Sequence, residues 1–229
     1  MADNRIKAFL STLARVSKGE WTPQTGLADG TPFSAPWLQK LAMDGRMFVA
    51  NAGTGTAPIT GAGAYVNTTP DLDMSVPAGR VVVPIYLTVQ FETYGTSLLN
   101  EIVAAIGWGG VIAPTSATAV VPVATNPAKS QGSSATIVSD GTGATYMTSN
   151  VYEFWRHGQA FSITKTSASA TVASQDSVRF EWSAMASGVW PVMYNPSGIS
   201  RFNLFPCSQA PTEFITLVYV EPDPAIFLA

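Results

Sequence analysis

RVVVPIYLTVQFETY, residues 80–94, is the stretch that decides the fold. Apolar side chains occupy every second position, at Val81, Val83, Ile85, Leu87, Val89 and Phe91. Because successive side chains of a β-strand point to opposite faces, this alternation predicts one long strand with an apolar inner face. Pro84 has no N–H to donate to a ladder, so we expect an edge or a bulge at that residue. This strand is the spine against which the other strands should pair or pack.

Further strands are expected on both sides of the spine. Before it, residues 45–51 and 72–76 are candidates, and Pro77-Ala78-Gly79 is the turn that leads into the spine. After it, the candidates are residues 100–111, 135–139, 144–148, 150–156, 160–166, 177–186, 188–194, 199–205 and 213–221. Residues 100–111 could also form a short helix, but we favour a strand. Residues 214–220 are apolar on both parities, which predicts a central strand or one covered on both faces. The pattern indicates an all-β fold.

Residues 4–18, NRIKAFLSTLARVSK, carry the one convincing helical pattern. Its apolar stripe consists of Ile6, Phe9, Leu10, Leu13 and Val16. Residues 1–19 carry four basic side chains and one acidic one, whereas the rest of the chain is acidic. A basic amphipathic helix can dock on a neighbouring subunit or a lipid surface, or cover an edge of its own sheet. Four basic groups are few for nucleic acid, which we do not expect to be the main partner.

A connector over residues 20–44 separates this N-terminal arm, residues 1–19, from a β-domain over residues 45–229. Its prolines, Pro23, Pro32 and Pro36, exclude a long helix. A short helical turn at residues 36–43 is expected, with a proline near its first position. The aromatic side chains of the connector should anchor it to a surface, of its own domain or of a neighbour.

The composition suits a β-protein whose surface is largely covered. The chain has 229 residues, enough to bury a sizeable core without disulfides or metals. Only 12% of the residues are charged, about half the usual share. Interface cores are depleted in charge, so this composition fits either a well-buried domain or one that faces other subunits. Neither a signal peptide nor a membrane-spanning helix is evident, and we expect a chain made in the cytoplasm.

The sequence has little that could support catalysis. A single histidine, His157, excludes multi-histidine metal sites. His157 as a general base, alone or with the single cysteine Cys207, is a weaker interpretation than a loop histidine and an incidental cysteine. Asp71 and Asp73 could be calcium ligands, but solvated charges at a strand edge are the preferred interpretation. No nucleophile elbow, Walker loop or dinucleotide pattern occurs.

Two pairs of glutamates could serve a glycosidase if the fold brought them together. These pairs are Glu92 with Glu101, and Glu153 with Glu181. Nothing in the sequence places either pair side by side. We therefore expect no catalytic residue, no cofactor and no metal.

Aromatic side chains crowd the C-terminal half, at Tyr152, Phe154, Trp155, Trp182, Trp190 and Tyr194. They could belong to the core, anchor a protein interface, or form a platform on which sugars stack. Alternation assigns Trp182 to an inner face together with Phe180. Trp155 and Trp190 stay open among the three interpretations.

The arm at residues 4–18, the strand pair around Val76-Pro77-Ala78-Gly79 and the closing strand at residues 214–220 together resemble the jelly-roll capsid and virion proteins, including those of bacteriophages. The resemblance implies a single jelly-roll β-sandwich of about eight strands in two antiparallel sheets. It also implies a homo-oligomer, a trimer or larger, that contacts other virion proteins. We therefore expect a non-enzymatic virion structural protein. The alternatives are a carbohydrate- or receptor-binding sandwich of a viral fibre or spike and, less favoured, a glycoside hydrolase.

Overall fold

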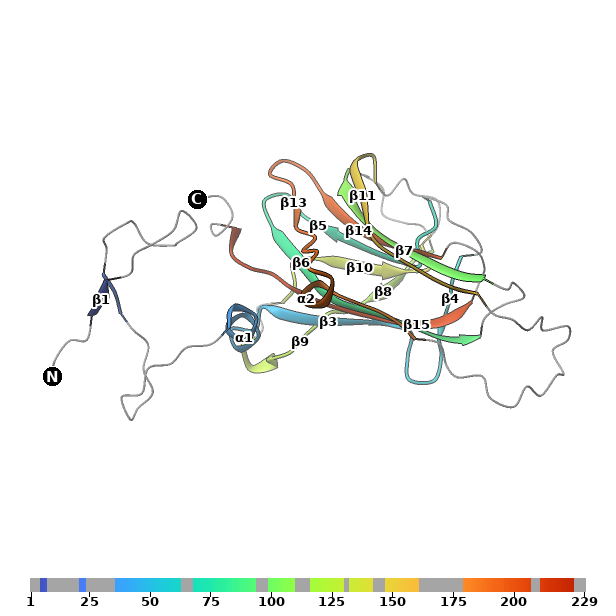
Figure 1. Ribbon diagram of the computed structural model, residues 1–229, viewed down its shortest axis with the longest axis horizontal. Helices are drawn as coiled ribbons and strands as arrows, with labels where there is room; N and C mark the ends of the chain where they lie inside the picture. The colour runs from blue at the N-terminus through green and yellow to red at the C-terminus, as the bar shows by residue number, and fades with distance from the viewer. Residues whose placement is uncertain are drawn as a thin grey trace, which may run out of the picture.

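The computed structural model describes residues 5–7, 21–23, 36–62, 68–93, 99–109, 116–129, 132–141, 147–160, 179–206 and 211–224. Most of these residues form β-strands, arranged in two antiparallel sheets (Figure 1). One large apolar core contains side chains from both sheets, as in a β-sandwich. The predicted all-β class is confirmed.

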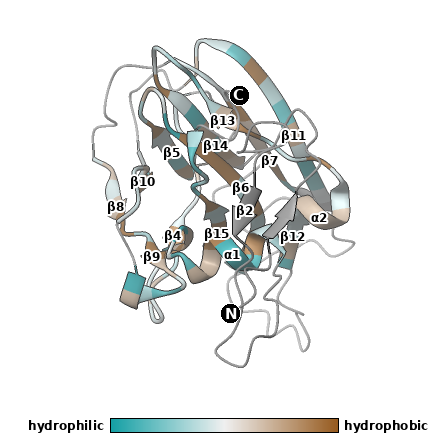
Figure 2. Ribbon diagram, turned by 90° about the vertical axis from the view of Figure 1, so that its left-hand side faces the viewer, coloured by the Kyte–Doolittle hydropathy of each residue, from teal (hydrophilic) through white to brown (hydrophobic). Residues whose placement is uncertain are grey.

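The six-stranded sheet has the strand order β11-β7-β14-β5-β10-β8. Its strands are β5 (Leu72–Val76), β7 (Leu99–Trp108), β8 (Thr118–Val120), β10 (Thr136–Ser139), β11 (Ser149–Ala160) and β14 (Ser200–Pro206). Hydrophobic and hydrophilic residues follow one another as bands along β11 (Figure 2). This alternation is expected of a strand that turns one face to a core.

The seven-stranded sheet has the order β12-β6-β15-β3-β9, with β13 paired to β6 and β4 paired to β15. Its strands are β3 (Met47–Ala52), β4 (Ile59–Thr60), β6 (Val81–Thr93), β9 (Val123–Ala124), β12 (Arg179–Ser183), β13 (Met193–Tyr194) and β15 (Thr212–Val220). The predicted spine is β6. β15 lies between β6 and β3, so the central position expected for residues 214–220 is confirmed.

The main strand pairs are nested in chain order. β7 pairs with β11, β6 with β12, β5 with β14 and β3 with β15, all antiparallel. Successive pairs alternate between the sheets, because β3 and β6 lie in the seven-stranded sheet and β5 and β7 in the six-stranded one. The chain therefore runs out and back like one long hairpin folded around the core. β8, β9 and β10 are additions between β7 and β11.

The spine strand changes face at a bulge. Val218 pairs with Tyr86 but the next residue, Tyr219, pairs with Pro84, so Ile85 is the extra residue. Beyond the bulge, Leu87, Val89 and Phe91 lie in the core between the sheets. Before it, Val81, Val83 and Ile85 belong to a separate cluster with Leu41. The bulge expected near Pro84 is confirmed, but the single apolar inner face predicted from the alternation is wrong for these three residues.

Aromatic rings fill much of the core. Phe91 meets Phe180 edge-on, with ring centroids 5.1 Å apart. Trp182 meets Phe154 from the opposite sheet in the same way, with centroids 4.8 Å apart. The inner position predicted for Trp182 and Phe180 is confirmed. Contacts of this geometry stabilise a core beyond their buried area.

The chain before the sandwich differs in part from its prediction. Helix α1 (Trp37–Met43) follows Pro36, as expected for residues 36–43. The helix predicted from residue 4 is wrong at β1 (Arg5–Lys7), which pairs with β2 (Trp21–Pro23), with Ile6 opposite Thr22. A strand segment directs its backbone groups sideways to its partner, so they cannot make the bonds of a helical turn. The rest of the predicted stripe, Phe9, Leu10, Leu13 and Val16, lies outside the described residues.

Candidate functional site

Two tryptophans meet on the outside of the seven-stranded sheet. Trp37 of α1 and Trp190, between helix α2 (Ala184–Ser187) and β13, have ring centroids 5.7 Å apart. Both stay exposed, at 48% and 38% of their surface. Val189 and Val192 beside Trp190 are exposed too. We call Trp37, Val189, Trp190 and Val192 the tryptophan patch. Exposed aromatic side chains grouped in this way are typical anchors of interfaces.

Local sequence explains why the patch forms. Leu38 and Leu41 of α1 pack on Val81 and Val83 of β6 and so hold the helix on the outer face of the sheet. A Lys40–Asp44 ion pair of 2.7 Å spans the last turn of α1. In α2, the Ser183 hydroxyl accepts a hydrogen bond from the Ala186 N–H, and Gly188 ends the helix at a φ of 71°. Both helices are held in place by these contacts, and Trp37 in α1 and Trp190 after α2 therefore stay exposed to solvent.

A buried acid centre lies where the two sheets meet at one end of the sandwich. Glu213, in β15, has no exposed surface, and Asp71, just before β5, has 1%. Asp71 Oδ1 accepts a 2.7 Å hydrogen bond from the Ala62 N–H. Asp71 Oδ2, both carboxyl oxygens of Glu213 and Asp140 Oδ1 are buried and have no donor among the described residues. Oxygens without donors at this depth favour the protonated carboxyl over the carboxylate.

The electrostatics of the acid centre follow from burial. Burial raises the pKa of Asp71 to about 7, and the charge of Asp140 adds to the rise, while the hydrogen bond from Ala62 and the one that a protonated Glu213 would donate oppose it. Burial also raises the pKa of Glu213 well above its usual value, and the charges of Asp71 and Asp140 raise it further. Like charges that share a buried site cannot both ionise readily, so the pair retains a proton.

Asp73 is the other buried aspartate, on the outer face of the six-stranded sheet. Its carboxylate accepts hydrogen bonds of 2.7 Å each from Arg201 Nη1 and Asn203 Nδ2. Burial raises the pKa of Asp73, and the Arg201 charge and both hydrogen bonds oppose the rise. The preferred interpretation of Asp71 and Asp73 as solvated strand-edge charges is wrong. Their partners, Arg201, Asn203 and Glu213, lie more than a hundred residues away and bury them.

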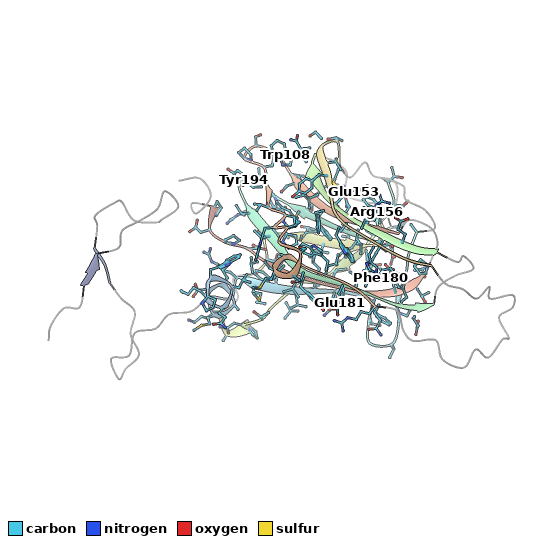
Figure 3. The ribbon with its side chains drawn as sticks, in the orientation of Figure 1. Trp108, Glu153, Arg156, Phe180, Glu181 and Tyr194 are labelled. Atoms are coloured by element: carbon cyan, nitrogen blue, oxygen red, sulfur yellow. The ribbon has the colours of Figure 1, made fainter. Side chains whose placement is uncertain are left out.

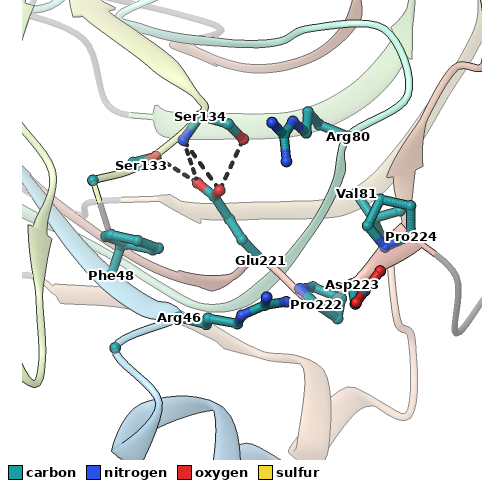
Figure 4. Close-up of a pocket in the computed structure, with 12 residues that line it drawn as sticks. Arg46, Phe48, Arg80, Val81, Ser133, Ser134, Glu221, Pro222, Asp223 and Pro224 are labelled. Atoms are coloured by element: carbon teal, nitrogen blue, oxygen red, sulfur yellow. Dashed lines mark hydrogen bonds between the residues drawn. The ribbon is translucent and has the colours of Figure 1, made fainter. Parts of the chain in front are cut away.

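A cavity of about 400 Å³ opens where β6 and β3 begin and β15 ends (Figure 4). Glu221 lies in it, and its carboxylate accepts hydrogen bonds from the Ser133 hydroxyl at 2.5 Å and the Ser134 hydroxyl at 2.8 Å. Arg46, Arg80 and Asp223 also line the cavity. Its two cationic and two anionic side chains balance, so the cavity has no excess charge that would attract an ion of either sign.

Three of the four glutamates considered for a glycosidase bind arginines. Glu153 and Glu101 both bind Arg156, at 2.8 Å each, on the six-stranded sheet. Glu181 pairs with Arg179 at 2.6 Å on the seven-stranded sheet. Figure 3 shows Glu153 beside Arg156 and Glu181 apart from both. The fold brings Glu101 and Glu153 to one arginine but does not bring Glu153 and Glu181 together.

The remaining candidates divide between core and surface. Of the tryptophans left open by the sequence, Trp155 is half-buried against the core and Trp190 is exposed in the tryptophan patch. His157 is exposed on β11 and packs edge-on against Phe180, with ring centroids 4.4 Å apart. The expected solvent-facing position of His157 is confirmed, but the residue lies within a strand and not in a loop. Cys207 lies outside the described residues.

The comparisons with known proteins give no match: no family model, curated protein or solved structure is similar to this chain. Within the described ranges, no cluster of three or more histidine, cysteine, aspartate or glutamate side chains has a geometry suited to a metal ion. The described helices are also all too short or too polar to cross a membrane. The geometry of the chain itself is therefore the basis of any functional argument.

The acid centre was missed by sequence reasoning, although one signal for it was present. Glu213 shares its parity in β15 with Ile215, Leu217 and Tyr219, all of which lie in the core. An acidic residue at an inward position of a half-buried strand must be neutralised or paired. Its partners could not be deduced, because Asp71 and Asp140 are brought to it only by the folded topology.

Proposed function

We propose that this chain is a virion structural protein without enzymatic activity, a capsid or capsid-associated subunit whose jelly-roll sandwich assembles with copies of itself. The strand order carries the proposal. Eight strands form the nested pairs β3–β15, β5–β14, β6–β12 and β7–β11. A hairpin folded in this way around one core supports a jelly roll, an architecture used by viral capsid domains, lectins and cupins.

Chemistry favours the capsid role among these options. Cupin enzymes hold a metal with several histidines, whereas this chain has one histidine in all. A fold alone does not determine function, so the surface has to support the choice. Only 12% of the residues are charged, a composition that suits a surface largely covered by other subunits.

The tryptophan patch supports a second copy of the chain as its occupant. Trp37 lies in the connector, residues 20–44, that joins the arm, residues 1–19, to the sandwich. The 17 connector residues before Trp37 (20–36) could span up to about 55 Å if fully extended, which is far enough to reach a neighbouring subunit. The arm and the patch are thus suited to link neighbouring subunits.

Size-exclusion chromatography with light scattering tests this function. The full chain should form a trimer or a larger species, and deletion of residues 1–19 should leave a folded domain that assembles less. Trp190→Ser should weaken association roughly thirty-fold, the effect of losing about 2 kcal/mol at an interface tryptophan. Trp108→Ser is the matched control, because Trp108 is similarly exposed but lies on β7 of the other sheet. A monomer at high concentration would contradict self-assembly.

The alternative role in carbohydrate or receptor binding rests on the same exposed rings, because Trp37 and Trp190 could stack on a sugar. A glycan array separates the two functions. Glycan binding by the isolated protein that is lost in Trp190→Ser, without any change in oligomeric state, would favour this alternative.

A further inference from the structure

We propose that Asp71 and Glu213 form a proton-dependent clasp that holds one end of the sandwich closed in acidic solution and loosens it as the pH rises through neutrality. The inference is independent of the proposed virion role. The clasp is a pH-sensitive conformational switch within a single chain.

The clasp joins four segments from both sheets. Glu213 lies in β15 of the seven-stranded sheet, and Asp71 precedes β5 of the six-stranded one. Asp140 follows β10, and its N–H donates to the Asp71 carbonyl at 3.3 Å. Gly61, after β4, donates to the Pro211 carbonyl at 2.8 Å, just before β15. Asp71 accepts the Ala62 N–H through its side chain and the Asp140 N–H through its main-chain carbonyl, so this residue connects the segments.

The clasp needs a proton because the described residues around it supply no counter-charge. The charged groups that act on Glu213 are Asp71 and Asp140, and both are acidic. Asp140 is likewise the one other charge that raises the pKa of Asp71. Arg201, the cation buried nearby along β14, is bound to Asp73. With one proton, Glu213 and Asp71 can share a hydrogen bond. Without it, three buried oxygens have no donor and two negative charges face each other.

The direction of the pH dependence follows from linkage. The pKa of Asp71 in the folded chain is about 7, above its usual value of 3.8. A group whose pKa is raised by folding binds its proton more tightly in the folded state. Its stabilisation is therefore complete below about pH 4 and is lost as the pH rises through about 7.

Equilibrium unfolding of the full chain between about pH 5 and pH 8.5 tests the clasp. The wild-type unfolding constant should rise steeply over this range, by roughly a hundred-fold or more. Glu213→Gln supplies a permanent N–H donor to Asp71 and removes one of the two titrating acids, so its unfolding constant should rise clearly less over this range than that of the wild type. Glu181→Gln, at an exposed glutamate on β12, should follow the wild type. Equal pH dependence in Glu213→Gln and the wild type would overturn the proposal.

Two measurements on the wild-type chain keep the proposal testable if Glu213→Gln fails to fold. Infrared spectroscopy of the folded protein at about pH 6 should show the C=O stretch of a protonated buried carboxyl, and this band should fade above about pH 8. The Ala62 amide, which donates to Asp71, should exchange faster at high pH after correction for the intrinsic rate, whereas the central Leu217 amide should not. If no protonated carboxyl is detected at about pH 6, the clasp does not exist.

Discussion

Asp71 and Asp73 are separated by one residue and are both buried, but the chain neutralises them differently. Asp73 is bound by Arg201 and Asn203. Asp71 faces Glu213, a second acid. A guanidinium keeps its charge at every pH in which the protein is folded, whereas a proton exchanges with solvent. Asp73 is therefore neutralised by its arginine partner at any such pH, whereas the neutralisation of Asp71 depends on the pH.

The two centres also differ in what they hold together. Asn203 lies directly opposite Asp73 in the β14–β5 ladder, and Arg201 lies two residues along on the same face. The Asp73 network thus acts within the six-stranded sheet, where it strengthens one strand pair. The Asp71 centre acts between the sheets at one end of the sandwich. Loss of the Asp73 network should weaken the whole six-stranded sheet, and loss of the Asp71 centre should open one end of the sandwich.

The largest effect is expected from removing the cation of the Asp73 network. Arg201→Met leaves the Asp73 carboxylate buried without a counter-charge, and we expect a loss of about 3–5 kcal/mol in the free energy of unfolding. Urea unfolding at about pH 7 measures it.

Arg156→Met is the matched control for this substitution. Arg156 also binds carboxylates, those of Glu101 and Glu153, but its side chain is 48% exposed. An exposed pair of this kind contributes about 1 kcal/mol or less. Equal losses in Arg201→Met and Arg156→Met would show that burial of Asp73 carries no special cost.

A smaller effect is expected from crowding the acid centre. An added Cβ at Gly61 would lie 2.9 Å from Asp71 Oδ2 and 3.0 Å from Pro211 Cδ. Gly61→Ala should therefore displace the clasp and destabilise the protein by about 1–3 kcal/mol, as overpacking does. Gly55→Ala, where an added Cβ meets nothing within 4 Å, should stay within about 0.5 kcal/mol of wild type. Thermal unfolding of both variants measures the difference. If Gly61→Ala left the stability unchanged, this end of the sandwich would be loosely packed.

Much of the sandwich could be predicted because period-two alternation reports directly on strands. Alternation predicted β6 directly. Residues 100–111 also allowed a helix and were favoured as the strand that β7 forms, and β15 was expected to be covered on both faces because it is apolar on both parities. The change of face within β6 could not be read from the alternation, since Val83 and Leu87 share one parity in the sequence. Pro84 gave a partial signal, because a residue without an N–H favours a bulge. Tertiary packing of α1 then provided the apolar cover that the outer half of β6 needs.

The acid centre could not be predicted from sequence for a different reason. Asp71, Asp140 and Glu213 are about seventy residues apart from one to the next, and only the nested pairing brings them together. Local pattern describes which face a side chain occupies, but not what it meets there. The tryptophan patch could not be predicted for the same reason, since Trp37 and Trp190 are separated by most of the chain length and meet only in the fold.

The smallest effect in this comparison is expected at Asp140, the third acid of the centre. Burial raises the pKa of Asp140, but it is only about half buried, so solvent screens its charge. Asp140→Asn should leave stability unchanged at about pH 5, and should raise it by less than about 1 kcal/mol at about pH 8, where it removes a negative charge facing Asp71 and Glu213. Asn also tolerates the left-handed backbone at this position, where φ is 55°. Urea unfolding at both pH values measures the effect, and the gain should shrink in the Glu213→Gln background, because fewer charges remain for Asp140 to repel. A loss of stability at about pH 8 would instead show that Asp140 stabilises its surroundings by hydrogen bonding, and that the proton of the clasp is held by burial alone.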